Sequence, residues 1–163
     1  MQIQQQMLEH YASCGAQKSP PHITLQPPFE WAPEQVLVLE FTIGTFVFGR
    51  ESVPVTLSGF GAFPPRVIYI NVVRTQELLT LQTDLMAYLE TRLGIVDPVA
   101  KTRAFSPHMT VAFRDLTRQN FKAAWPEFQQ RQLQFEFTAT QLTLLLHDGN
   151  RWNVSAEFPF LVS

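Results

Sequence analysis

Apolar and polar residues alternate along the chain with two different periods, which predict a mixture of helices and strands. A period near 3.6 residues places apolar side chains on one face of a helix. It predicts helices at residues 3–14, 32–49 and 75–93, and a fourth that begins after Thr117. Strict alternation is typical of strands, and it predicts strands at residues 53–60, 66–73, 133–139, 141–147 and 152–160. The sequence therefore predicts an α+β fold.

The ends of these elements carry recognisable signals. Thr75 and Thr117 are typical N-cap residues of helices, and Gly94 is typical of a helix C-terminus. Pro126 should kink or shorten the last helix. The sequence Asp148-Gly149-Asn150 predicts a hairpin turn. Residues 32–49 are ambiguous, because their β-branched and aromatic residues favour a strand whereas Pro33 and the apolar spacing favour a helix. We expect a helix there, since the segment lies between a strand and a hairpin.

One pattern of proline, histidine, apolar residue, threonine and apolar residue occurs twice. The first motif is Pro21-His22-Ile23-Thr24-Leu25, and the second motif is Pro107-His108-Met109-Thr110-Val111. If each motif forms a strand, its histidine and threonine share one face and its apolar residues share the other. Each motif follows a predicted helix and a loop and precedes a further helix. We therefore expect a single domain of residues 1–163, built as two pseudo-symmetric lobes of antiparallel sheet and helices around a central cleft lined by the motifs.

Composition limits which ligands the chain can bind and in which part of the cell we expect it. The chain has 163 residues, 45% of them apolar, and its formal net charge is −2. This charge gives no basic face for long duplex nucleic acid, although a nucleotide or the end of an RNA is compatible. Cys14 is the only cysteine, which excludes an intramolecular disulfide and a thiolate metal cluster. No signal peptide or membrane-spanning stretch is evident, so we expect a cytoplasmic protein without membrane contact.

Two histidines that face each other across a cleft can divide general acid and general base work, because free histidine titrates near pH 6.5. Cleavage of a phosphodiester through a cyclic phosphate, or hydrolysis of that cyclic phosphate, needs this pairing. The hydroxyls of Thr24 and Thr110 could hold the non-bridging phosphate oxygens. Metal binding by His22 and His108 is an alternative, but no carboxylate or thiolate lies at ligand spacing, which makes a poor metal site.

The two motifs, together with Leu57-Ser58-Gly59-Phe60-Gly61-Ala62-Phe63 and the following Arg66-Val67-Ile68, resemble the 2H phosphoesterases. This superfamily includes 2'-5' RNA ligases and cyclic nucleotide phosphodiesterases, and the resemblance covers nearly the whole chain. It implies a bilobal α+β fold, cleavage or reversible ligation of 2'-linked or 2',3'-cyclic phosphodiesters, and no metal or nucleotide cofactor. By motif match, His22 and His108 would be the acid/base pair, and Thr24 and Thr110 would bind the phosphate.

Several other residues are candidates for substrate contact. Arg66 and Arg103 could offer a guanidinium to phosphate, or they could simply face solvent. Phe29, Phe105 and Phe113 flank the motifs and could stack on a base, although packing in the core is the more ordinary role for a phenylalanine in a small domain with 14 of them. Tyr69 lies on a strand between the predicted lobes and could do either. His10 and His147 lack a threonine two residues later, and we expect both to be structural or surface residues.

Two departures from the family pattern affect the interpretation. Many relatives carry a basic residue after the second motif where this chain has Phe113, with Arg114 one position later and on the opposite face of the strand. Relatives also usually begin with a strand before the first helix, whereas this chain begins almost inside that helix. We therefore expect one sheet to lack a strand, with a homodimer partner, a rearranged segment or a further N-terminal strand filling the gap. The functional alternative to an enzyme is a non-catalytic nucleotide- or RNA-binding module that keeps the cleft.

Overall fold

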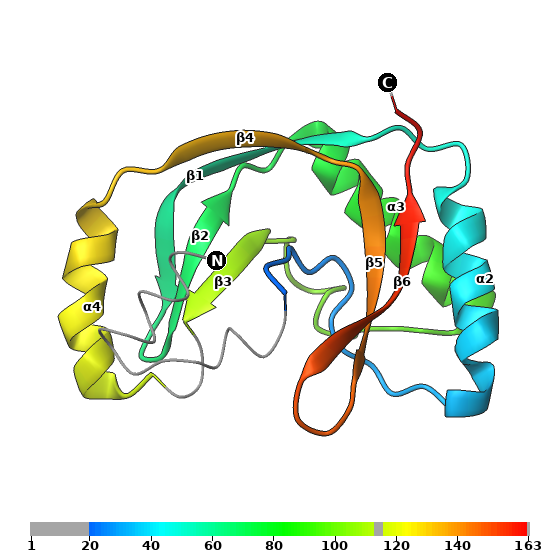
Figure 1. Cartoon of the computed structure of the whole chain (residues 1–163), viewed down its shortest axis with the longest axis horizontal. Coiled ribbons are helices and arrows are strands. Elements are labelled where there is room, and N and C mark those ends of the chain that lie inside the picture. Colours follow the sequence, from blue (N-terminus) through cyan, green and yellow to red (C-terminus); the bar gives the residue numbers. More distant parts are fainter. Residues whose placement is uncertain (1–19, 113–115, 163) are drawn as a thin grey trace.

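The structure is a computed structural model that describes residues 20–112 and 116–162, and it shows helices packed on antiparallel sheet (Figure 1). The helical elements are the 3-10 turn η2 (Pro33–Gln35) and the helices α2 (Val36–Val47), α3 (Gln76–Leu93) and α4 (Arg118–Gln130). The strands are β1 (Val53–Phe63), β2 (Val67–Val72), β3 (His108–Ala112), β4 (Gln134–Ala139), β5 (Gln141–His147) and β6 (Trp152–Pro159). The predicted α+β class is confirmed.

The strands form two separate sheets of unequal size. One sheet has four antiparallel strands in the order β3-β2-β1-β4, and the other is the hairpin β5-β6. The sequence led us to expect one sheet that is short by one strand. The strand expected before the first helix would fall outside the described residues, and within those residues the β5-β6 sheet has two strands.

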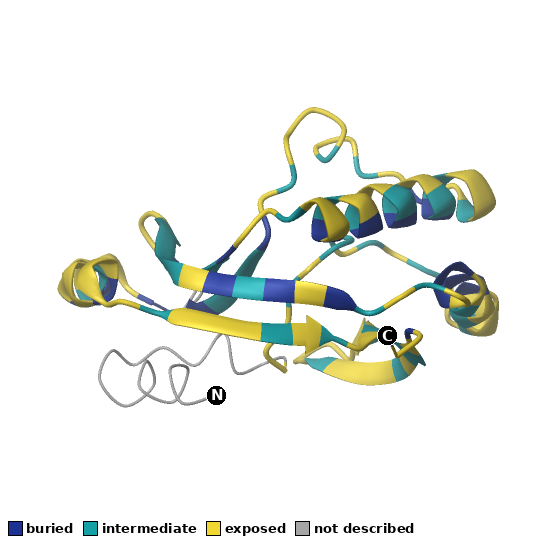
Figure 2. Cartoon of the chain, turned by 90° about the horizontal axis from the view of Figure 1, so that it is seen from above, coloured by how far each residue is buried: buried dark blue, intermediate teal, exposed yellow. Residues whose placement is uncertain are grey.

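The core lies between one face of the four-stranded sheet and the helices. Alternate residues of β1 and β2 are buried, as the period of two predicted. Figure 2 shows the buried residues of α3 along the side that faces β1, and α4 also contacts β1. The helices contribute a row of apolar side chains at helical spacing, namely Leu78, Leu81, Leu85 and Leu89 from α3 and Phe121, Ala124 and Phe128 from α4.

The predicted helix ends are confirmed by hydrogen bonds. The hydroxyl of Thr75 accepts the N–H of Leu78 at 3.3 Å, and the hydroxyl of Thr117 accepts the N–H of Asn120 at 3.1 Å. Each threonine thereby satisfies one of the free N–H groups in the first turn. Gly94 ends α3 in the left-handed conformation with φ 67°. Pro126 does not end α4, which continues to Gln130.

The ambiguous segment is helical, so the prediction for residues 32–49 is confirmed by η2 and α2. One face of α2 is buried against α3 and β6, with Leu39 only 1% exposed. The opposite face is also apolar: Leu37 and Phe41 are each 77% exposed. A helix that is apolar all round leaves no polar face for solvent, which explains why the sequence pattern alone was ambiguous here.

The hairpin between β5 and β6 turns at the predicted residues. Oδ1 of Asp148 accepts the N–H groups of Asn150 and Arg151, each at 2.8 Å, and Oδ2 accepts from the side chain of Asn153 at 2.9 Å. The backbone N–H of Arg151 and then that of Asn150 lower the pKa of Asp148 to about 2. Because the pKa is lowered in the folded chain, these hydrogen bonds stabilise the turn at neutral pH and are lost as the pH falls toward 2.

Candidate functional site

The candidate site is a pocket of about 470 Å³ that is bordered by both motifs. Thr24 from the first motif and His108 from the second line the same pocket, although they are far apart in the sequence. The rest of the wall comes from Pro27, from Arg74 after β2, from α3 and from the loop that precedes β3. A hollow of this volume is in the range of sites that hold small organic ligands. The lining includes Thr24, Arg74, Leu79, Gln82, Asp97, Arg103, Phe105, Ser106 and His108.

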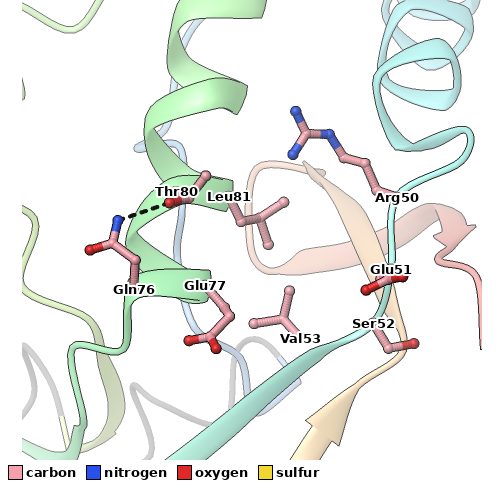
Figure 3. A pocket seen from close by; sticks show the side chains of 8 residues that line it. All are labelled: Arg50, Glu51, Ser52, Val53, Gln76, Glu77, Thr80 and Leu81. Carbon is pink, nitrogen blue, oxygen red and sulfur yellow. Dashed lines mark hydrogen bonds between the residues drawn. The ribbon is translucent and has the colours of Figure 1, made fainter. Parts of the chain in front are cut away.

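A second hollow, of about 410 Å³, lies between the first turns of α3 and the start of β1 (Figure 3). Its arginine is already engaged, because Arg50 donates to Asp84 at 3.0 Å and lies 4.1 Å over the ring of Phe46. The carboxylates of Glu51 and Glu77 border the same hollow. It contains no residue of either motif, so it does not bring the candidate chemistry together.

The two motif histidines are held in the same way. Nδ1 of His22 lies 2.6 Å from the carbonyl oxygen of Pro20, and Nδ1 of His108 lies 2.7 Å from the carbonyl oxygen of Ser106. A carbonyl oxygen can only accept, so Nδ1 carries the proton in both rings. The other nitrogen, Nε2, is then a lone-pair acceptor in the neutral ring and a donor in the protonated ring. Each histidine therefore presents Nε2 as the atom that can take or give a proton.

The second motif forms strand β3, as predicted, and its register fixes the surroundings of His108. His108 pairs with Asn71 on β2, and Thr110 pairs with Tyr69. The ring of His108 lies 5.1 Å from the ring of Tyr69 and 5.3 Å from that of Phe63, centroid to centroid. Val111, on the opposite face of β3, is 3% exposed and belongs to the core. The alternation of β3 thus separates the imidazole from the apolar packing beneath it.

Gly61 on β1 supports this arrangement, because the ring of Tyr69 lies directly over it. A Cβ atom at position 61 would overlap ring carbons of Tyr69. We expect the variant Gly61→Ala to displace this ring and to lower the free energy of unfolding by about 1–3 kcal/mol, as overpacking does. Urea denaturation measures this loss.

The matched control is Gly44→Ala in α2, where a Cβ atom would meet the ring of Phe158 at an ordinary 3.7 Å. That variant should gain about 0.5–1 kcal/mol, because alanine is the better helix former. Combining Gly61→Ala with Tyr69→Ala should remove the overlap and show a smaller loss than the two single losses added. A strictly additive double variant would contradict a direct clash between positions 61 and 69.

The prediction that the first motif forms a strand is wrong. Residues 21–25 have no strand assignment, and the segment belongs to neither sheet. The missing strand has a physical cause in the prolines at 20, 21, 27 and 28. A proline lacks the N–H that a strand ladder needs. The segment is instead tied to α3, because Nε2 of Gln82 donates to the carbonyl oxygen of Leu25 at 3.5 Å. This contact places Thr24 on the pocket.

The remaining sequence candidates lie in different places. Arg66 is exposed in the turn between β1 and β2, and the lining of the candidate pocket does not include it. Phe29 is half-buried against the core, with its ring 6.1 Å from that of Trp31. Phe113 lies outside the described residues, as does the predicted helix 3–14. The approach of His22 to His108 across the cleft stays a prediction.

Two residues near the site were missed by the sequence reasoning. Phe63 contacts His108, and Arg74 lines the pocket directly after the end of β2. The signal for Arg74 is its position, because a residue that follows a strand paired with the histidine strand must leave the sheet beside the second motif. No signal of that kind exists for Phe63, whose neighbour depends on the register between β1, β2 and β3.

The described part of the chain has neither a cluster of metal-ligating side chains nor a helix that could span a membrane. Across residues 20–112 and 116–162, no three His, Cys, Asp or Glu side chains gather in a group that could hold a metal ion. No helix in these ranges is both long and apolar enough to span a bilayer.

Comparison with known proteins finds one matching family and several similar bacterial proteins. The chain matches the family description "2'-5' RNA ligase superfamily" over residues 2–151. A protein of Bacillus pumilus (strain SAFR-032) that is named as a phosphoesterase is 27% identical over 144 residues, which cover 85% of this chain and 78% of that protein. A similarly named protein of Geobacillus kaustophilus (strain HTA426) is 28% identical over 142 residues, with the same two coverages.

Solved structures show the same fold. The protein TT0787 of Thermus thermophilus superimposes with a TM-score of 0.63 at 19% identity, covering 98% of this chain and 92% of that one. E. coli LigT, solved as a complex with NADP+, gives a TM-score of 0.60 at 20% identity and covers 98% and 91%. LigT was also solved with 3'-AMP. The family match spans nearly the whole chain, and the chain therefore belongs to the 2'-5' RNA ligase superfamily.

Proposed function

We propose that the chain is a metal-independent phosphoesterase that acts on 2'-5' or 2',3'-cyclic phosphodiesters of RNA or nucleotides. The observation that carries this proposal is the matched pair of hydrogen bonds from Nδ1 of His22 and of His108 to backbone carbonyls. Both rings are held so that Nε2 is free to exchange a proton. Membership of a family of phosphoesterases and RNA ligases supports the same chemistry.

In the proposed reaction, Nε2 of one histidine removes a proton from a water molecule or hydroxyl as its oxygen attacks phosphorus. Nε2 of the other histidine, which begins protonated, gives its proton to the ribose oxygen as the P–O bond breaks. The hydroxyls of Thr24 and Thr110 donate to the non-bridging oxygens, where negative charge increases in the transition state. In the reverse direction the two histidines exchange roles, so the same groups could join a hydroxyl to a cyclic phosphate.

The nature of the ligands in related structures supports a nucleotide substrate. LigT, which shares the fold, was solved with NADP+, 3'-AMP, ATP and phosphate. The candidate pocket of this chain has the volume for a nucleotide-sized molecule. We therefore propose a nucleotide or an RNA end as the substrate, rather than a phosphorylated protein.

The test is an assay of the purified chain, in EDTA, with 2',3'-cyclic nucleotides and with 2'-5'-linked dinucleotides. We expect turnover that EDTA does not reduce, and a bell-shaped dependence of kcat/KM on pH, because one histidine must be neutral and the other protonated. Abolition of turnover by EDTA would contradict the metal-independent mechanism. Binding of these compounds without any turnover would instead identify a non-catalytic nucleotide-binding module.

A further inference from the structure

We propose that the part of the candidate pocket lined by Arg74 and Arg103 binds a second phosphate group of the same substrate. The inference rests on the proposed function and specifies its substrate class. The substrate would be a nucleotide or oligonucleotide that carries another phosphate besides the phosphodiester that reacts at His108. Neither arginine belongs to the two motifs.

The topology brings the two arginines to the same end of the sheet. Strands β2 and β3 are antiparallel, and Asn71 pairs with His108. The chain that follows Asn71 and the chain that precedes His108 therefore leave the sheet at one end. Arg74 belongs to the chain that leaves β2 at this end, and Arg103 belongs to the chain that leads into β3. Both line the pocket with His108.

The charges around these arginines favour an anionic ligand. The salt bridges found in the described parts of the chain join Arg50 to Asp84 and Lys101 to Glu90, and neither involves Arg74 or Arg103. Asp97 is the acidic residue of the pocket lining, but its Oδ1 already accepts the N–H groups of Val99 at 2.9 Å and Ala100 at 3.3 Å. Two guanidinium groups thus concentrate positive charge in a chain whose formal net charge is −2.

A guanidinium matches phosphate in geometry as well as charge, because its N–H groups form a fork toward two oxygens. In the proposed reaction the reacting phosphodiester lies against Thr24 and His108, which are both part of the pocket lining. The pocket of about 470 Å³ is much larger than one phosphodiester. Leu79 and Phe105 add apolar side chains to the lining, against which a sugar or base can lie. The arginines are therefore placed for another anionic group of the same molecule.

The experiment compares two substrates that differ by one phosphate: adenosine 2',3'-cyclic phosphate, and the same compound with a 5'-phosphate. For the native chain we expect kcat/KM to be about 10- to 100-fold higher for the compound with the 5'-phosphate, the range of one or two charge-assisted hydrogen bonds. In Arg74→Gln and in Arg103→Gln the ratio of the two kcat/KM values should fall toward one. Most of this change should be a higher KM for the compound with the 5'-phosphate.

The matched control is Arg118→Gln, because Arg118 is exposed at the start of α4 and lines neither hollow. It should keep the native ratio. Circular dichroism checks the fold of each variant. A ratio that stays at the native value in both pocket variants would overturn the inference. This includes the case in which the two substrates lose activity equally, because the arginines would then serve the reacting phosphate.

A binding measurement separates failure of this inference from failure of the proposed function. Calorimetry with adenosine 2',5'-bisphosphate and adenosine 2'-phosphate requires no turnover. We expect the bisphosphate to bind the native chain more tightly, and the difference to be lost in Arg74→Gln. If the chain turns over neither substrate but shows this difference, the proposed reaction is wrong and the second phosphate site stands. Equal binding of the two compounds by the native chain would refute the site.

Discussion

Replacing His108 by alanine should lower kcat/KM for a 2',3'-cyclic nucleotide by about two to four orders of magnitude, the usual effect of removing a general acid or base. Replacing His22 by alanine should cost a similar factor. The reason is that Nε2 of each ring supplies one of two proton transfers that occur with breakage of the P–O bond. Because the two histidines act as a unit, the double variant should be little worse than either single variant. Steady-state kinetics on the three proteins measures this directly.

The control is His147→Ala. His147 is exposed at the end of β5, where its Nδ1 accepts the N–H of Gly149 and its ring lies 5.0 Å from that of Trp152. It therefore has a structural role at the hairpin, and we expect its replacement to leave kcat/KM within about twofold, since surface changes are usually mild. Full activity in either motif variant would refute the assignment of that histidine as acid or base.

Replacing Phe128 by alanine should lower the free energy of unfolding by about 3–5 kcal/mol. Phe128 is 0% exposed on α4, and its ring lies 5.2 Å from the ring of Phe60 on β1. Its removal leaves a cavity between helix and sheet that the surrounding backbone can fill only in part. Since a typical domain is stable by about 5–15 kcal/mol, this single change should consume a large part of the total. Urea denaturation monitored by circular dichroism gives the value.

The comparison variant is Phe41→Ala, which removes the same side chain from the exposed face of α2, where it is 77% accessible. Its effect should stay within about 0.5 kcal/mol. Equal losses in the two phenylalanine variants would show that packing between α4 and β1 does not dominate the stability of the chain.

Local sequence signals predicted most of the fold. The four leucines of α3, the hydroxyl of Thr75 and the left-handed Gly94 each act within a few residues, so one stretch of sequence contains the whole cause of the helix. Similarly, Asp148 makes its turn hydrogen bonds to neighbours. The helix assignment of α2, which is apolar on both faces, was correct, although the first motif, one of the two neighbours from which it was argued, is not a strand.

The site was harder to predict, because its geometry depends on partners that are distant in the sequence. The second motif has a strand partner, β2, and its alternation followed the expected pattern. The first motif has the same residue pattern but prolines on both sides and no paired strand, so pattern alone misjudged it. The contact of Phe63 with His108 follows from strand register, which the sequence does not state, whereas the place of Arg74 could have been inferred from its position after β2.

The irregular path of the first motif has a consequence for how the two histidines resist displacement. His108 begins a strand whose backbone is hydrogen-bonded to β2, so moving it requires opening part of the four-stranded sheet. Within the described part of the chain, no backbone-to-backbone hydrogen bond involves residues 20–31. The side chain of Gln82 donates a hydrogen bond to the carbonyl oxygen of Leu25 in this segment. Apolar side chains of this segment, such as Ile23 and Leu25, pack against the core, but a segment outside a strand ladder opens at a lower free energy than the paired sheet does. The amide groups around His22 should therefore exchange with solvent through local openings that leave the sheet beneath His108 closed, so that one histidine has a fixed position and the other an adjustable one.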